Sequence, residues 1–144
     1  MDEMKPSSCK AKGRRLQQKV AQSIRDAFSG LTEDDVRSTS MGAGGEDVQL
    51  SSRARECVPL SVECKCVEKL NVWQCLEQAE RNCPAEATPC LVFSRNRAGT
   101  YAVLPWEALL ALYVRIDAGT LPPRLRALLA EVARWHAEEG VAAP

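Results

Sequence analysis

The chain has 144 residues, enough for one domain of ordinary size or two very small ones. Hydrophobic residues make up 45% and charged residues 26%, which is typical of a globular protein and excludes a chain that is disordered throughout. The 19 basic and 19 acidic residues cancel, so any surface that binds a polyanion must be local. Apolar runs too short for a membrane span and a polar N-terminus without a secretory signal predict a cytoplasmic protein with no membrane partner.

Cysteine usage is the next compositional feature. Seven cysteines, an odd number, in a chain without an export signal do not predict a disulfide framework. Only Cys64 and Cys66 form a close pair, and the single histidine, His136, lies far along the chain. Because structural zinc sites normally use two tight pairs of ligands, zinc binding is disfavoured. The cysteines are mostly interpreted as small buried hydrophobic residues.

The first part of the chain is expected to form a disordered tail over residues 1–9 and then a helix. Apolar residues recur every four positions from Leu16 to Phe28 and predict a helix over residues 10–28, with basic side chains mainly in its first two turns. The next predicted elements are a strand, a Gly-rich loop, a second strand, and a turn or short helix, at residues 36–40, 41–45, 47–50 and 51–57.

The second part alternates strands and helices. The predicted elements are a strand, a helix, two hairpin strands and two helices, at residues 61–67, 71–82, 90–93, 100–104, 105–114 and 123–139. Prolines at the start of the last two helices fit their first turns. This order predicts an α/β fold in which helices flank a central mixed β-sheet, with an extra C-terminal helix.

Two charged residues stand out in the strand over residues 61–67. Side chains alternate along a strand, so Glu63 and Lys65 point to one face, about 6.7 Å apart, while Cys64 and Cys66 point to the other. A surface ion pair is the simpler explanation and is worth about 0–1 kcal/mol. The flanking valines indicate a central strand, however, where a charge needs a partner or a purpose.

A carboxylate from the neighbouring strand, Asp47, adds to this pair. Two acids and a lysine are the minimum for hydrolysing a phosphodiester with Mg²⁺. Two carboxylates can hold the hard cation and leave positions for water and phosphate. The lysine, Lys65, can stabilise negative charge on the phosphate or position the attacking water.

Four segments in this order resemble the PD-(D/E)xK nuclease superfamily, and within it the archaeal-type and phage-type Holliday junction resolvases. They are Lys12-Gly13, Val36-Arg37-Ser38, Glu46-Asp47 and Val62-Glu63-Cys64-Lys65. Residues 68–80 and 89–93 are similar to phage-type resolvases in particular. The resemblance covers about residues 10–113, which it marks as a nuclease domain, and leaves residues 114–144 as a C-terminal helical extension. It implies a restriction-endonuclease-like fold for the predicted sheet.

The resemblance also implies the composition of the catalytic site. Asp47, Glu63 and the backbone carbonyl of Cys64 would bind Mg²⁺, for which Mn²⁺ can substitute. Lys65 would complete the site. The implied activity is metal-dependent cleavage of branched DNA, and two symmetric cuts of a four-way junction require a homodimer with two active sites. A phage or prophage origin in a bacterial cell follows from the same likeness.

Some positions depart from the family's pattern. Gln17 stands where these resolvases usually have a glutamate, so it would act in the catalytic group through its amide, without charge. Glu46-Asp47 replaces the usual Pro-Asp, which leaves Glu46 as the fallback for Asp47 as metal ligand. Gln78, on the helix after the strand, is a further possible site residue. Because Gln17 lacks the charge of the usual glutamate, a catalytically silent DNA-binding protein is one alternative function. A nicking or repair nuclease with another DNA target is a second alternative.

Residues on several elements are candidates for DNA binding. They are Lys12, Arg14, Arg15, Arg37, Ser38 and Lys69. For the helix residues, a solvated polar face is the alternative to phosphate contact. Trp73 and Trp106 are interpreted as core or interface residues rather than platforms for DNA bases, and the helix that contains Trp73 is the candidate dimer interface.

Overall fold

The structure is a computed structural model that describes residues 6–40, 42–115, 127–128, 130–132 and 134. The chain divides into two compact units, residues 1–106 and 107–144. The division lies slightly before residue 113, the predicted end of the nuclease domain. All the predicted site residues belong to the first unit.

The first helix, α1, spans Pro6–Ala27. It begins before residue 10, so the prediction of a tail is wrong for residues 6–9, and residues 1–5 lie outside the described part of the chain. Proline suits the first turn of a helix, where an N–H would have no intrahelical partner. The four-residue periodicity is confirmed: Leu16 and Val20 are buried, and the apolar residues that continue the series pack against the same core.

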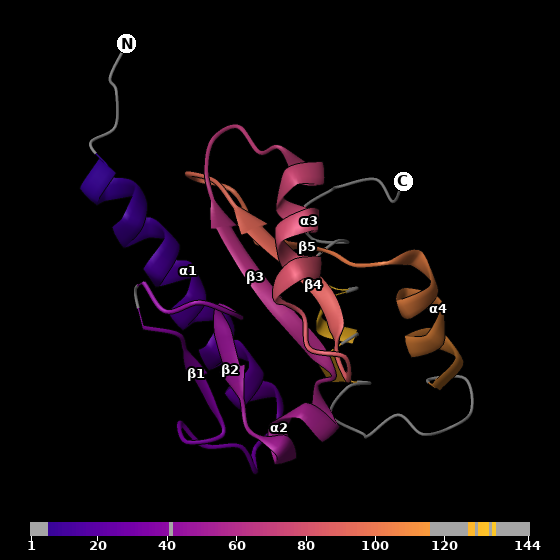
Figure 1. Cartoon of the computed structure of the whole chain (residues 1–144). Helices are drawn as coiled ribbons and strands as arrows, with labels where there is room; N and C mark the ends of the chain where they lie inside the picture. Colours follow the sequence, from indigo (N-terminus) through magenta and orange to yellow (C-terminus); the bar gives the residue numbers. More distant parts are fainter. Residues whose placement is uncertain (1–5, 41, 116–126, 129, 133, 135–144) are drawn as a thin grey trace. The chain divides into compact units, whose positions relative to one another are not determined.

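Two short strands follow, β1 (Val36–Ser38) and β2 (Val48–Leu50), which pair antiparallel. Val36 and Val48 are fully buried, and α1 packs against both strands (Figure 1). The short helix α2 (Ser52–Cys57) comes next, where the sequence predicts a turn or helix. It begins there because the Ser51 hydroxyl accepts a hydrogen bond from Ala54 N at 3.1 Å and caps the first turn.

The remaining strands form a three-stranded mixed sheet in the order β3-β4-β5. Its strands are β3 (Leu60–Cys66), β4 (Thr88–Ser94) and β5 (Tyr101–Val103). β3 and β4 are parallel and are connected through α3 (Val72–Asn82), whereas β4 and β5 form the predicted antiparallel hairpin. The Asn71 side chain caps α3 by accepting a hydrogen bond from Gln74 N at 3.2 Å.

The strands form two sheets and not one, so the prediction of a single central sheet is wrong in this respect. One backbone hydrogen bond, from Asp47 N to Val62 O at 3.0 Å, connects the two sheets. The next backbone amide of β3 on that edge, Cys64 N, donates to the side chain of Asp47 instead. The ladder therefore ends at Asp47, and the edge of β3 beyond it carries a side chain where a strand could have paired.

Helices lie on the two faces of β3. α1 contacts β1, β2 and β3, and α3 contacts β3 and β4 (Figure 1). Side chains of β3 that face α1 are buried in the main hydrophobic core, whose members are Leu16, Val20, Ala21, Leu31, Val36, Val48, Ala54, Val62, Cys64, Cys90 and Val92. The intervening residues, Glu63 and Lys65, contact α3. The predicted alternation of β3 is thus confirmed.

The cysteines are free thiols with different environments. Cys64 and Cys90 are buried, and burial raises the pKa of the Cys90 thiol to about 11. Such a thiol is protonated at neutral pH and behaves as a hydrophobic residue, as predicted. The prediction that most cysteines are buried is therefore wrong, because Cys66, Cys75 and Cys83 are half-buried and Cys9 and Cys57 are exposed.

The second unit contains most of α4 (Trp106–Arg115), which confirms the helix predicted over residues 105–114. No α4 side chain is buried, and Trp106 is 64% exposed, so Trp106 is not a core residue. Residues 127–128, 130–132 and 134 are helical, while the rest of the helix predicted over residues 123–139 lies outside the described residues. Among the helices that the structure describes, none combines the length and apolar character needed to cross a bilayer.

Candidate active site

The centre of the candidate site is an acid–base pair on β3. Glu63 is only 2% exposed, and its Oε1 lies 2.9 Å from Nζ of Lys65. The Lys65 side chain is 27% exposed, so it reaches from the surface to the buried carboxylate. A carboxylate this deeply buried requires a partner, and the ion pair supplies one. The prediction that both side chains occupy one face of the strand is confirmed, whereas the prediction of a central strand is wrong, because β3 is an edge strand of the three-stranded sheet.

The helix α3 contributes two amide side chains to this pair. Gln78 Oε1 accepts a hydrogen bond from Lys65 Nζ at 2.9 Å, so Gln78 belongs to the site as the sequence suggested. Asn82 Nδ2 donates to Glu63 Oε2 at 3.4 Å. The two residues are four apart and share one helix face. Asn82 is not among the site residues predicted from the sequence, although its spacing from Gln78 was a usable signal.

Asp47 meets β3 at the open edge of the strand. Its Oδ2 accepts a hydrogen bond from Cys64 N at 2.7 Å. Burial raises the pKa of Asp47 above its usual value, and the negative charge of Glu63 adds to the effect. The hydrogen bond from Cys64 N and the positive charge of Lys65 act in the opposite direction. Asp47 and Glu63 are therefore close enough to repel each other, as two ligands of one cation would be before it binds.

Gln17 on α1 completes the group, in the place where the sequence predicts it. Its side chain lies close enough to Asp47 to favour the charged carboxylate and so to lower the pKa of Asp47. Its Oε1 is buried and has no hydrogen-bond partner among the described residues. Buried polar atoms nearly always have such a partner. The amide oxygen of Gln17 is thus an exception close to Asp47, and it is available as a further oxygen donor.

The donor atoms suit a hard cation. The structure's described part contains no group of three or more His, Cys, Asp or Glu side chains that could hold a metal ion. The available oxygens come from Asp47, Glu63 and Gln17. The carbonyl of Cys64 joins them, because the N–H and C=O of one strand residue point to the same edge. Mg²⁺ commonly takes one or two carboxylates and keeps several waters, so this oxygen set fits Mg²⁺.

Glu46 is held away from this oxygen set. Its carboxylate forms a bidentate ion pair with Arg55, at 2.9 and 2.7 Å, and both side chains are about 15% exposed. Arg55 also donates to Leu60 O at 2.8 Å. The structure therefore does not bring Glu46, the fallback ligand, together with Asp47 and Glu63. Consecutive residues of an extended segment point to opposite sides, so only one of Glu46 and Asp47 can face β3 Cys64.

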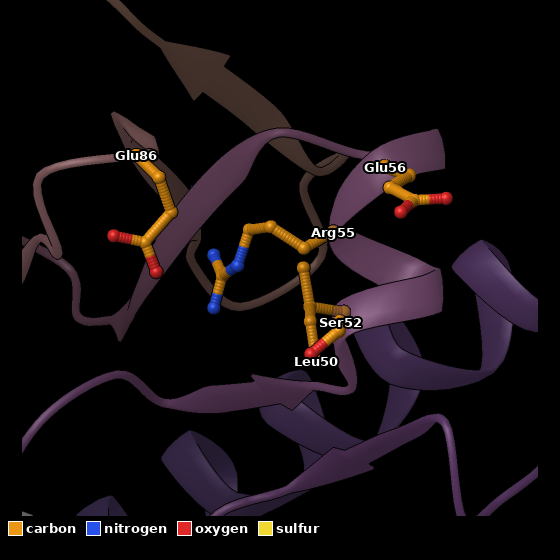
Figure 2. A pocket seen from close by; sticks show the side chains of 5 residues that line it. All are labelled: Leu50, Ser52, Arg55, Glu56 and Glu86. Atoms are coloured by element: carbon orange, nitrogen blue, oxygen red, sulfur yellow. The ribbon is translucent and has the colours of Figure 1, made fainter.

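A pocket of about 430 Å³ lies beside this ion pair. Figure 2 shows Arg55 extending from α2 into the pocket, with Glu86 across from it and Glu56 turned away. The Arg55 guanidinium already binds Glu46 and a backbone carbonyl, so a structural role explains why Arg55 lies here.

We expect Arg55→Met to destabilise the fold by about 2–3 kcal/mol, because it leaves a poorly solvated Glu46 carboxylate and the Leu60 carbonyl without their donor. Urea denaturation with Arg53→Met as the matched control measures the effect, since Arg53 is exposed on the same helix. Adding Glu46→Gln to Arg55→Met should recover part of the loss. Equal stability of the Arg53 and Arg55 variants would contradict a structural role for the ion pair.

The predicted DNA-binding residues lie on three separate elements. Arg14 and Arg15 are exposed on α1, and Lys12 is partly exposed one turn before Leu16. Lys69 is exposed in the loop after β3. On β1, Arg37 is exposed and donates from Nε to Gln49 Oε1 at 3.0 Å, while Ser38 is half-buried. The described contacts gather the catalytic candidates around Asp47 and Glu63 but do not join these residues into one patch.

Comparisons of the chain with models of protein families, with curated proteins and with solved structures find no match.

Proposed function

We propose that the chain is a Mg²⁺-dependent DNA endonuclease with a restriction-endonuclease-like fold, and that it cleaves four-way junctions. The observation that supports it is the set of oxygens beside a lysine: buried Glu63 paired with Lys65, Asp47 at the open edge of β3, and the unsatisfied Oε1 of Gln17. Two adjacent carboxylates and an orphaned acceptor oxygen cost stability in the absence of a cation. Such local costs are typical of sites kept for chemistry.

Each residue has a distinct role in this proposal. Asp47 and Glu63 hold the cation, with the Gln17 amide oxygen and the Cys64 carbonyl as further donors. When bound, Mg²⁺ supplies Lewis-acid stabilisation of a phosphate oxygen and a more acidic water. Lys65 releases Glu63 and donates a hydrogen bond to the scissile phosphate, where negative charge grows during attack by water. Gln78 continues to accept a hydrogen bond from the Lys65 ammonium and so restricts the positions that this ammonium can occupy.

The substrate part of the proposal draws on the likeness to phage-type resolvases and on the exposed basic side chains of α1. A resolvase must place two active sites on one junction, so the functional form is an isologous homodimer. An enzyme of phage or prophage origin in the cytoplasm of a bacterial cell belongs to the same proposal. Mn²⁺ should support the reaction in place of Mg²⁺.

Cleavage assays on end-labelled DNA test the proposal. The protein is incubated with Mg²⁺ and either a four-way junction or linear duplexes with the same arm sequences. Paired symmetric nicks in the junction, absent with EDTA, are the expected result. Equal cleavage of junction and duplex would indicate a nicking or repair nuclease. Binding without cleavage in Mg²⁺ and in Mn²⁺ would indicate a silent DNA-binding protein.

The dimer gives a separate prediction. Trp73 lies near the start of α3 and is 78% exposed, so it is no core residue and remains available for an interface. We expect sedimentation to show a dimer whose dissociation constant rises at least about 30-fold in Trp73→Ser, the size of an aromatic hot spot. Trp106→Ser is the matched control. A monomeric protein that still makes paired cuts would contradict this prediction.

Salt dependence tests the role of α1. If Arg14 and Arg15 hold phosphates, the double variant Arg14→Glu/Arg15→Glu should flatten the log–log plot of affinity against salt by about 1.8, at about 0.9 per contact. Binding should weaken for all sequences alike. The control Arg53→Glu/Arg81→Glu changes the same charge on α2 and α3. An unchanged slope in the α1 variant would indicate that DNA passes elsewhere, along Arg37, Lys69 and Arg95.

A further inference from the structure

A second pocket lies between the loop after β3 and the turn that joins β4 to β5. It encloses about 330 Å³, near the lower end of the range for small-ligand sites. We call it the aromatic pocket and define it by Val67, Glu68, Leu70, Phe93, Arg95 and Tyr101. The rings of Phe93 and Tyr101 stack with centroids 6.0 Å apart and planes at 28°. Tyr101 is nevertheless 57% exposed, so much of its ring faces solvent.

The rim of the aromatic pocket carries both charges. Arg95 and Glu68 line it, and the exposed Arg97, two residues after Arg95, adds a second cation to the turn. The turn is held in place: Ser94 Oγ donates to Gly99 O at 3.1 Å, and Asn96 N donates to Glu68 Oε1 at 3.0 Å. Lys19 of α1 donates to Thr100 Oγ1 at 3.1 Å but does not line the pocket. The exposed guanidinium groups of Arg95 and Arg97 can contact phosphates, while the Glu68 carboxylate is held by the backbone of the turn.

The aromatic pocket adjoins the candidate active site on the same sheet face. Lys65 is paired in register with Phe93, and Phe93 with Tyr101. The backbones of Phe93 and Tyr101 therefore lie about 5 and 10 Å from the backbone of Lys65, counted across the strands. Along the chain, Val67 comes two residues after Lys65, about 6.7 Å further on if the strand continues. DNA with a phosphate at Lys65 would bring its neighbouring nucleotide to this pocket.

We propose that the aromatic pocket binds an unpaired base of the DNA strand that is cleaved, with Arg95 and Arg97 on the adjoining phosphates. The inference rests on the proposed nuclease function and adds the form of DNA that the site prefers. An exposed aromatic ring stacks on any base, provided that the base is free of its neighbours. Bases inside a continuous duplex are stacked on both faces and cannot enter. The pocket thus favours DNA that is open next to the cleavage point over uninterrupted duplex.

Equilibrium binding without cleavage tests this inference. The purified protein, in whatever oligomeric state it adopts, is titrated in the presence of EDTA into two fluorescent single-stranded DNAs. One is a 12-mer of thymidine, and the other is a 12-mer of the same charge whose central nucleotides are abasic. We expect the wild type to bind the intact strand about 10-fold more tightly, as for one stacked base. Tyr101→Leu should reduce this ratio to about one, whereas Tyr101→Phe, the matched control that keeps the ring, should preserve it. Arg95→Ala/Arg97→Ala should weaken both strands equally.

Other outcomes separate this inference from the nuclease proposal. A wild-type ratio near one, or a ratio that Tyr101→Leu leaves unchanged, would overturn the base pocket even if the protein cleaves junctions. A ratio that depends on Tyr101 in a protein that cleaves no DNA would support the pocket and reject the nuclease. If Tyr101→Leu instead changes the sedimentation of the protein and not the ratio, the pocket belongs to a protein interface and the inference is wrong.

Discussion

Glu63→Gln should lower the rate of Mg²⁺-dependent cleavage by at least about 1,000-fold, which corresponds to about 4 kcal/mol in the activation barrier. Glu63 is the most deeply buried charged residue of the candidate site, and its two oxygens contact Lys65 and Asn82. Glutamine keeps the shape and one acceptor oxygen but removes the charge that holds a divalent cation. Single-turnover cleavage at saturating DNA measures the chemical step without the binding step.

DNA affinity should stay within a few-fold in the same variant, because phosphate contacts outside the metal site supply most of the affinity. Glu77→Gln is the matched control, since Glu77 is an exposed acid on α3. Glu80→Gln serves the same purpose one turn later. Cleavage by Glu63→Gln at a rate close to that of Glu77→Gln would remove Glu63 from the mechanism and with it the proposed metal site.

Most elements of the fold could be predicted because their signals are local. The spacing of Leu16 and Val20 identified α1, and the alternation of Glu63 with Cys64 gave the two faces of β3. The division into two sheets could not be predicted. It depends on Asp47, whose side chain takes the backbone amide of Cys64 that a longer β2 would have paired with. Local patterns carry no information on whether a strand ladder continues.

The site was predictable in residue type but not in every position. Glu46 is an alternative to Asp47 at the level of sequence because neighbouring residues satisfy the same motif. The choice depends on which of the two side chains faces β3. Arg55 binds the Glu46 side chain, so Asp47 is the residue that faces β3. Asn82 was missed since its contact with Glu63 joins elements that are 19 residues apart. The orphaned oxygen of Gln17 is likewise visible only once the burial of that atom is known.

The charge of Asp47 should be unfavourable for folding when no cation is bound. Its pKa is raised in the folded protein, mainly by burial, so the folded state binds the proton more tightly than the unfolded state does. The stabilisation is complete below the ordinary value of 3.8 and is lost as the pH rises through the raised pKa. At pH 7 in EDTA, Asp47→Asn should therefore melt at a higher temperature than the wild type. The difference should shrink as the pH falls toward 3.8.

The hydrogen bond to Cys64 N survives in this variant. Asparagine at position 47 can still accept from Cys64 N through its Oδ1, while its Nδ2 can donate to Gln17 Oε1 only if the glutamine amide turns over, which moves Nε2 into the buried position that Oε1 leaves. The expected gain in stability therefore comes from the removed charge at position 47 and not from Gln17. Mg²⁺ should reverse the order: at 100 times its dissociation constant it should stabilise the wild type by about 2.7 kcal/mol and the variant hardly at all. Thermal melts with and without Mg²⁺ measure both effects, with Asp34→Asn, an exposed acid, as control. An Asp47→Asn protein that Mg²⁺ stabilises as much as the wild type would place the cation elsewhere.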